Sequence, residues 1–355
     1  MNSSSYLLIL ALLSLSTSSM ASELELTKKN TKAKEWTFTS SGNTLLRFEN
    51  ETFDVRQHRQ RLRLIVRAGA QAHYGDFRVA GRLSTGVKNK QNIPAITIAK
   101  FNQQSQPAND VFVERLLVSY RTPTLSVTAG KQPWSLANQT DTFWDRQLNP
   151  IGLQAQYTFN PNHRGHFSVL KPLDGATDTV GTLFLVQWES KINMADGTLI
   201  FAPWWVGYQG QNNAQYARRD TQHDHQSIRL STAYQSGLWR IGADLGYAFD
   251  NPDIDGESAQ NQSVVLQLVY GKLVKQFDYQ AHLRFFHTEQ YSVISEFAQN
   301  ATAGFATTNI KGLDTRVRYN IKSNIWLGMR YSQVATLVGS AERGRRFRIE
   351  TAIKF

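Results

Sequence analysis

From about residue 42 to the C-terminus, apolar and polar residues alternate along the chain. In one such segment, Leu62, Leu64 and Val66 share one face, whereas Arg61 and Arg63 share the other. Successive side chains of a strand point to opposite faces of a sheet, so this period of two predicts β-strands. One face of these strands is apolar, and the other is polar and often basic.

Sixteen segments follow this pattern, and the connections between them are alternately short and long. The long connections lie near 87–110, 133–150, 207–225 and 289–308 and occupy alternate slots. This arrangement predicts an all-β fold, an antiparallel transmembrane β-barrel with periplasmic turns and extracellular loops. The stretch 164–206 is less regular, because Leu183 to Trp188 is nearly continuously apolar and Pro203 interrupts a strand, so fourteen to eighteen strands fit the pattern. The sixteen segments lie near 42–54, 57–72, 76–86, 111–121, 124–132, 151–159, 164–170, 180–190, 196–206, 226–235, 238–249, 261–271, 276–288, 309–320, 324–336 and 344–355.

Aromatic residues gather next to the short turns, as expected where strands meet a membrane interface. The chain ends in Phe355, with apolar or aromatic residues at alternate positions before it. This ending resembles the C-terminal signature that the barrel-assembly machinery recognises, so that machinery is an expected partner. The aromatic residues beside short turns are Phe77, Tyr120, Tyr157, Phe159, Tyr234, Trp239, Tyr270, Phe277 and Tyr319.

Hydropathy and the N-terminus place the barrel in a membrane outside the cytoplasm. The mean hydropathy is −0.40, and beyond the N-terminus no apolar run approaches the roughly 20 residues that a membrane helix needs. A short apolar core over 6–13, followed by Ser19, Met20 and Ala21, predicts a signal peptide over 1–21, with a buried N-terminal helix as the alternative. We expect a periplasmic segment over 22–41 and a barrel over 42–355, in the outer membrane of a Gram-negative bacterium.

The charge of the chain limits the classes of partner that it could bind. The chain has no cysteine, which excludes disulfides and thiolate chemistry, and its net charge is +11. Nucleic acid, a membrane surface and anionic solutes could all attract such a charge. A basic residue on the lipid face of a barrel costs about 2–4 kcal/mol near the bilayer midplane, so the arginines are expected to face the lumen. This favours membrane lipid and anionic solutes as partners over nucleic acid.

Two interpretations of the lumen arginines stay open. They could pair with Glu49, Glu114, Asp244, Asp278, Asp314 and Glu350 in a neutral polar wall, or they could form an electropositive pore that favours anions. By alternation, the channel-lining residues are Arg61, Arg63, Arg67, Arg78, Arg82, Arg115, Arg229, Arg240, Arg284, Arg316, Arg318, Arg330, Arg346 and Arg348.

Three stretches resemble a family of bacterial outer-membrane porins: 113–120 (VERLLVSY), 127–133 (VTAGKQP) and 140–159 (TDTFWDRQLNPIGLQAQYTF). The Arg-Leu-Arg-Leu strand at 61–64 adds to the likeness, which covers roughly residues 45–170. The resemblance implies an outer-membrane channel of about sixteen strands and does not name a solute. The resemblance leaves open whether the chain forms a homotrimer.

The segment 133–150 is the third extracellular loop in this arrangement. In sixteen-stranded porins that loop folds inward and narrows the channel, which would place its two aspartates opposite an arginine wall and create a transverse field. An aromatic-anchored surface loop is the alternative. The expected constriction-loop residues are Trp134, Asp141, Trp144, Asp145 and Arg146.

No residue pattern indicates catalysis or a cofactor. His223, Asp224 and His225 resemble metal ligands, but they crowd on one polar loop without a distant third ligand, so a solvated loop is favoured. Asp76, Asp141 and Ser135 lack the pattern of nucleophile, base and orienting group that a hydrolase needs. We therefore expect neither an enzyme nor a bound metal.

The leading hypothesis is passive diffusion of small hydrophilic solutes, with a bias toward anions. The first alternative is a substrate-specific channel for acidic sugars or aromatic acids. The second, from another class, is an outer-membrane barrel enzyme.

Overall fold

The computed structural model describes residues 35–86, 94–102, 109–138, 142–172, 181–210, 224–249, 260–294, 297–298 and 307–355. These residues form strands joined by turns and loops. The strands are β1 (Trp36–Phe53), β2 (Arg59–Tyr74), β3 (Phe77–Gly86), β4 (Ile96–Lys100), β5 (Asp110–Arg121), β6 (Leu125–Lys131), β7 (Ile151–Asn160), β8 (His163–Lys171), β9 (Thr182–Met194), β10 (Gly197–Gln209), β11 (His225–Ser236), β12 (Trp239–Ala248), β13 (Gln262–Gly271), β14 (Tyr279–Thr288), β15 (Ile310–Lys322), β16 (Ile325–Thr336) and β17 (Arg343–Lys354).

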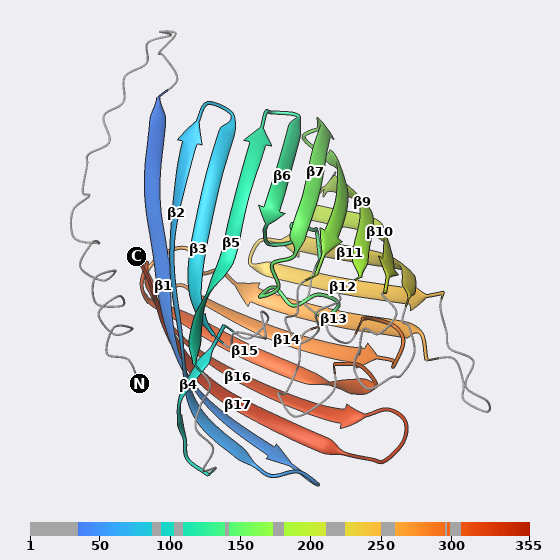
Figure 1. The fold of residues 1–355 in the computed structure, drawn as a ribbon. Coiled ribbons are helices and arrows are strands. Elements are labelled where there is room, and N and C mark those ends of the chain that lie inside the picture. Colours follow the sequence, from blue (N-terminus) through green and yellow to red (C-terminus); the bar gives the residue numbers. More distant parts are fainter. Residues whose placement is uncertain are drawn as a thin grey trace.

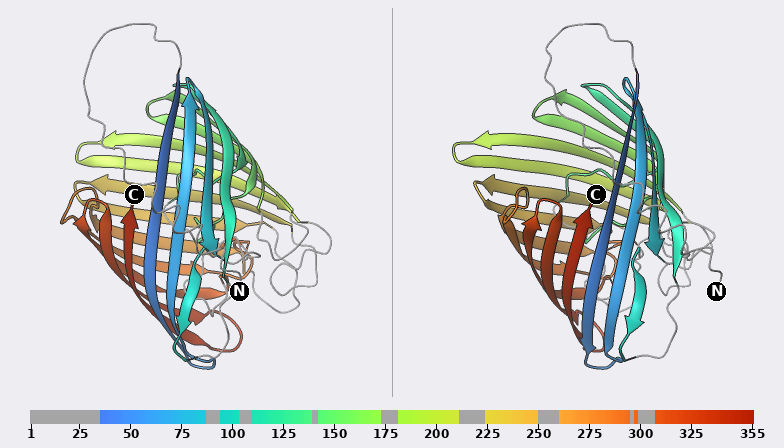
Figure 2. Two further views of the ribbon diagram at one scale, coloured as in Figure 1. Left: turned by 60° about the vertical axis from the view of Figure 1, so that its left-hand side comes forward. Right: turned by 90° about the vertical axis from the view of Figure 1, so that its left-hand side faces the viewer.

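The strands form one closed antiparallel barrel (Figure 1). Closure comes from β1 and β17, which pair from Asn43 opposite Lys354 to Phe53 opposite Gly344 and run side by side in Figure 2. The short strand β4 pairs only with the loop end of β2, beyond the point where β3 has left β2. Because β3 and β4 share one position beside β2, the described part of the chain forms a barrel of sixteen strands.

The predicted architecture is confirmed, with one addition. All sixteen predicted segments are barrel strands, whereas β4 lies inside a segment predicted to be a loop. Pro203 lies in β10, which pairs with β9 on both sides of Ala202 and Pro203 but not at these two residues. Proline has no amide hydrogen to donate, so the ladder is interrupted locally and the strand continues.

The N-terminal boundary differs from the prediction. β1 begins at Trp36, opposite Tyr74 of β2, so residues 36–41 belong to the barrel and not to the expected periplasmic segment over 22–41. The predicted signal peptide over 1–21 lies outside the described residues.

The outer face of the barrel is apolar and carries aromatic rings at one rim. Phe77, Phe159 and Trp239 are each more than half exposed, at 52%, 55% and 52%. The Phe77 ring lies 5.0 Å from that of Tyr120, and the Trp239 ring 4.5 Å from that of Tyr270. This edge carries the short turns, and we call it the short-turn rim. We call the opposite edge the loop rim.

No helix in the described ranges is long and apolar enough to cross a membrane.

A β-bulge in β5 turns two consecutive charged residues inward. Arg82 lies opposite Arg115, but Leu83 lies opposite Val113, so Glu114 is an extra residue on β5. A bulge re-aims side chains that strict alternation would place on opposite faces. Glu114 and Arg115 can therefore both contact the interior.

Asp278 lies in the turn before β14 and not on the inner wall, so its predicted pairing with lumen arginines is wrong. The backbone amides of Lys275 and Val274 donate to Asp278 Oδ2 at 2.8 and 2.9 Å. These two hydrogen bonds hold the pKa of the Asp278 carboxyl below its ordinary value of 3.8. The turn spans more residues than the predicted connection 272–275.

Candidate functional site

A row of arginines crosses three neighbouring strands on the inner face of the barrel. Arg316 of β15 lies directly opposite Arg330 of β16, and Arg330 lies directly opposite Arg348 of β17. Beyond Arg348, the row continues across the barrel closure to Glu49 of β1. Like charges directly opposite each other destabilise a sheet. Three adjacent guanidinium groups therefore require negative charge nearby.

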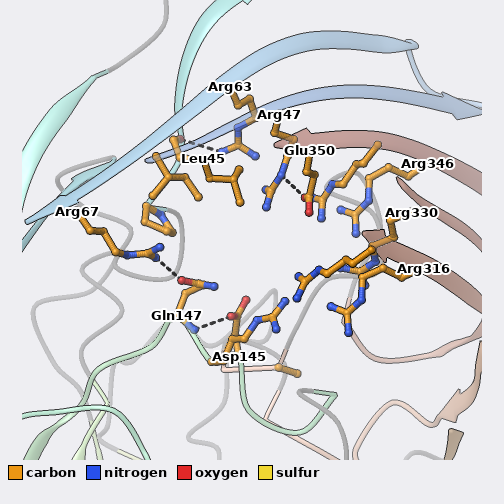
Figure 3. Close-up of a pocket in the computed structure, with 17 residues that line it drawn as sticks. Leu45, Arg47, Arg63, Arg67, Asp145, Gln147, Arg316, Arg330, Arg346 and Glu350 are labelled. Carbon is orange, nitrogen blue, oxygen red and sulfur yellow. Dashed lines mark hydrogen bonds and ion pairs between the residues drawn. The ribbon is translucent and has the colours of Figure 1, made fainter. Parts of the chain in front are cut away.

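These arginines line a cavity of about 330 Å³ inside the barrel. In Figure 3, Arg47, Arg316, Arg330 and Arg346 point toward a common space that Asp145 closes from the opposite side. We call this space the arginine cavity. Among the described residues, nine arginines and two carboxylates line it, together with a few apolar and amide side chains. They are Leu45, Arg47, Arg63, Ile65, Arg67, Pro94, Ala95, Asp145, Arg146, Gln147, Ala298, Arg316, Arg318, Arg330, Arg346, Arg348 and Glu350.

Glu49 is the central counter-charge of this wall, and its side chain is fully buried. Its carboxylate lies 2.7 Å from Arg348, 2.9 Å from Arg61 and 3.4 Å from Arg63. Arg47 contacts the same carboxylate at 3.4 Å. One carboxylate thus serves four guanidinium groups, which leaves excess positive charge.

Glu51 and Glu350 continue the same network. Arg61 reaches Glu51 at 2.9 Å, and Arg346 reaches it at 3.8 Å. Glu350 pairs with Arg47 at 2.6 Å. These pairs fix the arginine side chains in place at the edge of the arginine cavity.

Two further carboxylates anchor arginines on either side of this network. Asp314 accepts from Arg330 Nε at 2.7 Å and from Ser332 Oγ at 2.5 Å, and Arg284 lies 3.5 Å away. Glu114 pairs with Arg67 at 2.9 Å and with Arg82 at 2.5 Å. Each carboxylate is shared between two arginines.

The described parts of the connection between β6 and β7, residues 132–138 and 142–150, lie inside the barrel, and we call them the constriction loop. Trp134 and Trp144 contact each other edge to face, with ring centroids 4.3 Å apart. The ring centroid of Phe143 lies 5.1 Å from that of Trp204 of β10. The loop is therefore held by an apolar cluster inside the barrel and is not an aromatic-anchored surface loop.

The inner face of β8, β9 and β10 is apolar where the constriction loop packs. Leu183 and Leu185 of β9 and Val206 of β10 are fully buried in the same cluster as Phe143 and Trp144. This packing explains the nearly continuous apolar run from Leu183 that made the strand pattern irregular. The constriction loop covers the inner side of that stretch, and its outer side belongs to the apolar outer face of the barrel.

Arg229 of β11 joins two loops to the barrel wall. Its guanidinium lies over the Phe143 ring, 4.5 Å from the centroid, and donates to the Ser292 carbonyl at 3.3 Å. The Asp145 amide donates to the Phe297 carbonyl at 2.7 Å, so the loop after β14 also supports the constriction loop.

The tip of the constriction loop faces the arginine cavity. The side-chain oxygen Oε1 of Gln147 accepts from Arg67 Nη2 at 2.5 Å, and the backbone N–H of Gln147 donates to Asp145 Oδ1 at 2.8 Å (Figure 3). Asp145 and Arg146 line the cavity beside Gln147. Asp141, the other predicted aspartate, lies outside the described residues.

The structure divides the predicted arginines between the cavity and other parts of the inner face. Arg63, Arg67, Arg316, Arg318, Arg330, Arg346 and Arg348 line the cavity. Arg61, Arg82, Arg115 and Arg284 contact acidic or amide groups beside it, and Arg78, Arg229 and Arg240 lie elsewhere on the barrel. The cavity also contains Arg47, which the sequence prediction omitted although it alternates in phase with Glu49.

His225 corrects the interpretation of 223–225 as a solvated loop. It is the first residue of β11, fully buried, with Nε2 3.1 Å from Ser227 Oγ. Asp224 Oδ1 accepts from the Gly210 amide at 2.9 Å, and His223 lies outside the described residues. Within the described ranges, no group of three or more His, Cys, Asp or Glu residues could hold a metal ion.

Comparison with solved structures identifies the fold. OprB of Pseudomonas putida superposes with a TM-score of 0.58 at 8% identity, covering 90% of this chain and 94% of its own. OccAB4 of Acinetobacter baumannii gives 0.54 at 9% identity, covering 92% and 100%. A loop-deleted OmpT, an outer membrane protein of Vibrio cholerae, gives 0.53 at 14% identity, covering 90% and 99%. No family model and no curated protein matches the sequence. The chain has the fold of bacterial outer-membrane porins.

Proposed function

We propose that the chain is an outer-membrane channel through which small hydrophilic solutes diffuse, with a preference for anions. The apolar outer face and the aromatic short-turn rim suit a bilayer, and the charged side chains lie on the inner face. The constriction loop narrows the path, and solutes pass between its tip and the arginine wall.

The row of Arg316, Arg330 and Arg348 carries the anion preference. These three side chains face one another across adjacent strands, and the acids around them are each shared between several arginines. In a confined space with low-dielectric walls, the field of such a cluster raises the local concentration of anions.

Reversal potentials in planar bilayers test this proposal. With a KCl gradient across the bilayer, we expect chloride to be more permeant than potassium. Arg316→Gln combined with Arg318→Gln should lower the preference, whereas Arg345→Gln, an exposed position near the loop rim, should leave it unchanged. A cation-selective wild-type channel would refute the anion preference without affecting the fold.

A substrate-specific channel is the second candidate, because part of the cavity wall is apolar. Leu45 and Ile65 lie directly opposite each other on β1 and β2, and Pro94 and Ala95 line the same cavity. This wall suits a solute with an anionic group and an apolar or sugar body, such as an aromatic acid or an acidic sugar. Benzoate and glucuronate should then block the chloride current in a saturable way. A linear current that neither anion blocks would leave only general diffusion.

A further inference from the structure

A second basic pocket lies on the inner face at the short-turn rim, between β5 and β8. It has a volume of about 360 Å³ and is lined by Arg121 and Arg164 together with Ser126, Gln156 and Thr158. We call it the rim pocket. None of these residues lines the arginine cavity, so the two spaces are separate.

The strand register explains how these residues come together. Arg121 lies directly opposite Ser126, and Ser126 lies directly opposite Gln156. One step nearer the rim, Thr158 lies directly opposite Arg164. Polar side chains thus bridge two arginines across four strands.

The rim pocket opens to the interior and not to lipid. Side chains alternate along a strand, and the neighbours Tyr120, Tyr157 and Phe159 belong to the aromatic outer face. A ligand of this pocket therefore comes from the aqueous lumen or its mouth.

The arginines at this rim lack the carboxylate partners that surround the arginine cavity. In the described part of the chain, Arg78, Arg121 and Arg164 form no ion pair, and the buried Nε atoms of Arg78 and Arg164 have no hydrogen-bond partner. Arg78 lies opposite Ser119 and therefore diagonal to Arg121 on the same face. Their guanidinium groups therefore carry positive charge at this rim with no carboxylate in ion-pair contact in the described structure.

Glu189, the acid across the strand pair from Arg164, makes its direct contacts with other cations. Glu189 lies opposite Arg164 in the β8–β9 register, but its carboxylate contacts His166 Nε2 at 3.4 Å and Lys191 Nζ at 3.9 Å. Glu189 thus attracts Arg164 through space but leaves the guanidinium N–H groups of Arg164 without a carboxylate in direct contact.

We infer that the rim pocket is a second anion-binding site, for a small oxyanion of the phosphate or sulfate class. Guanidinium groups present paired N–H donors that match the oxygens of an oxyanion. Ser126, Thr158 and the Gln156 amide supply further neutral donors, and their side chains make no hydrogen bond within the described residues. An anion that has crossed the arginine cavity would meet this site at the mouth of the barrel.

A single introduced cysteine gives a local test, because the chain has none of its own. Thr124 lines the rim pocket and is exposed, so Thr124→Cys reports on the site, and exposed Ser340 gives the control Ser340→Cys at the loop rim. The measurement is the rate at which an anionic methanethiosulfonate reagent modifies each cysteine in detergent, with inorganic phosphate or with KCl of equal ionic strength.

We expect phosphate to slow modification of Thr124→Cys several-fold relative to KCl and to leave Ser340→Cys unaffected. Adding Arg121→Gln and Arg164→Gln should abolish this protection. Arg121→Gln alone, at an exposed position without ion pairs in the described structure, should weaken protection in a folded barrel. Equal rates in phosphate and KCl, or protection that survives both arginine replacements, would overturn the site. The readout does not require conduction, so it can fail or succeed independently of the proposed channel function.

Discussion

Arg330 of β16 lies directly opposite Arg348 of β17, and both side chains are buried on the inner face of the barrel. Their proximity is tolerated because each guanidinium reaches a different carboxylate, Arg330 to Asp314 and Arg348 to Glu49. The stability of the wall and its proposed preference for anions therefore depend on the same few acids. Replacing one of these acids should lower the stability and raise the anion preference.

Glu49→Gln should destabilise the barrel and strengthen anion preference. The substitution removes the charge that four arginines share, and breaking a buried ion pair costs roughly 3–5 kcal/mol. Urea unfolding followed by tryptophan fluorescence measures the first effect, and reversal potentials measure the second. An unchanged reversal potential would show that Glu49 does not control the field in the lumen.

Arg318→Gln should leave the stability of the barrel nearly unchanged and lower the anion preference. Arg318 has no carboxylate within ion-pair distance in the described structure, and its guanidinium lies 4.5 Å from the centroid of the Trp326 ring. Losing that contact costs about 0.5–1 kcal/mol, so the barrel should unfold at nearly the same urea concentration. The anion preference should fall because one uncompensated charge leaves the cavity. A large loss of stability would contradict this account.

Arg229→Gln should loosen the constriction loop and raise single-channel conductance. The substitution removes the contact over Phe143 and the hydrogen bond to the Ser292 carbonyl, which together tie two loops to β11. Arg240→Gln, on the neighbouring strand outside the arginine cavity, is the matched control. If both variants conduct like the parent, Arg229 does not hold the loop in place.

Gly130→Ala should be far more damaging than Gly81→Ala. Gly130 has φ +113°, and a Cβ there would meet the Leu116 carbonyl oxygen, whereas a Cβ at Gly81 would meet only ordinary contacts at 3.9 Å and beyond. A side chain in that backbone region costs about 1–3 kcal/mol before the clash is counted. The melting temperature of each variant is read as the temperature at which the band of the folded barrel disappears from a gel. Equal melting temperatures would show that the close approach of β5 and β6 relaxes easily.

Asp278→Asn should lower the melting temperature at neutral pH, with a difference that disappears in acid. The folded-state pKa of Asp278 is lowered by the amides of Lys275 and Val274, so the ionised carboxylate stabilises the turn above the unfolded pKa. That contribution is lost as the pH falls below about 4 through the folded-state value. Melting curves of both proteins between pH 7 and pH 3 should therefore converge, and a constant difference would assign the effect to something other than charge.

The barrel was predictable because alternation records, residue by residue, which face of the sheet a side chain occupies. The same rule assigned Arg316, Arg330 and Arg348 to the inner face of the barrel. It does not record the position of a strand around the barrel, so it could not separate these three from Arg78 and Arg240, which lie away from the arginine cavity.

Three local features escaped the alternation rule for physical reasons. The bulge at Glu114 shifts the phase by one residue, and the turn that contains Asp278 is longer than a two-residue hairpin turn. The strand β4 pairs with β2 over only a few residues, too few to show a period. The apolar inner face around Leu183 was a usable signal, because apolar side chains in a water-filled barrel require a partner inside.

The constriction loop packs on β8, β9 and β10, and its tip faces the arginine-bearing wall across the arginine cavity. The width of the open path is therefore uncoupled from the diameter of the barrel. It depends on how far the long guanidinium side chains, held by their carboxylate partners, extend toward the loop tip. Shortening these arginine side chains would widen the proposed path without changing the number or tilt of the strands.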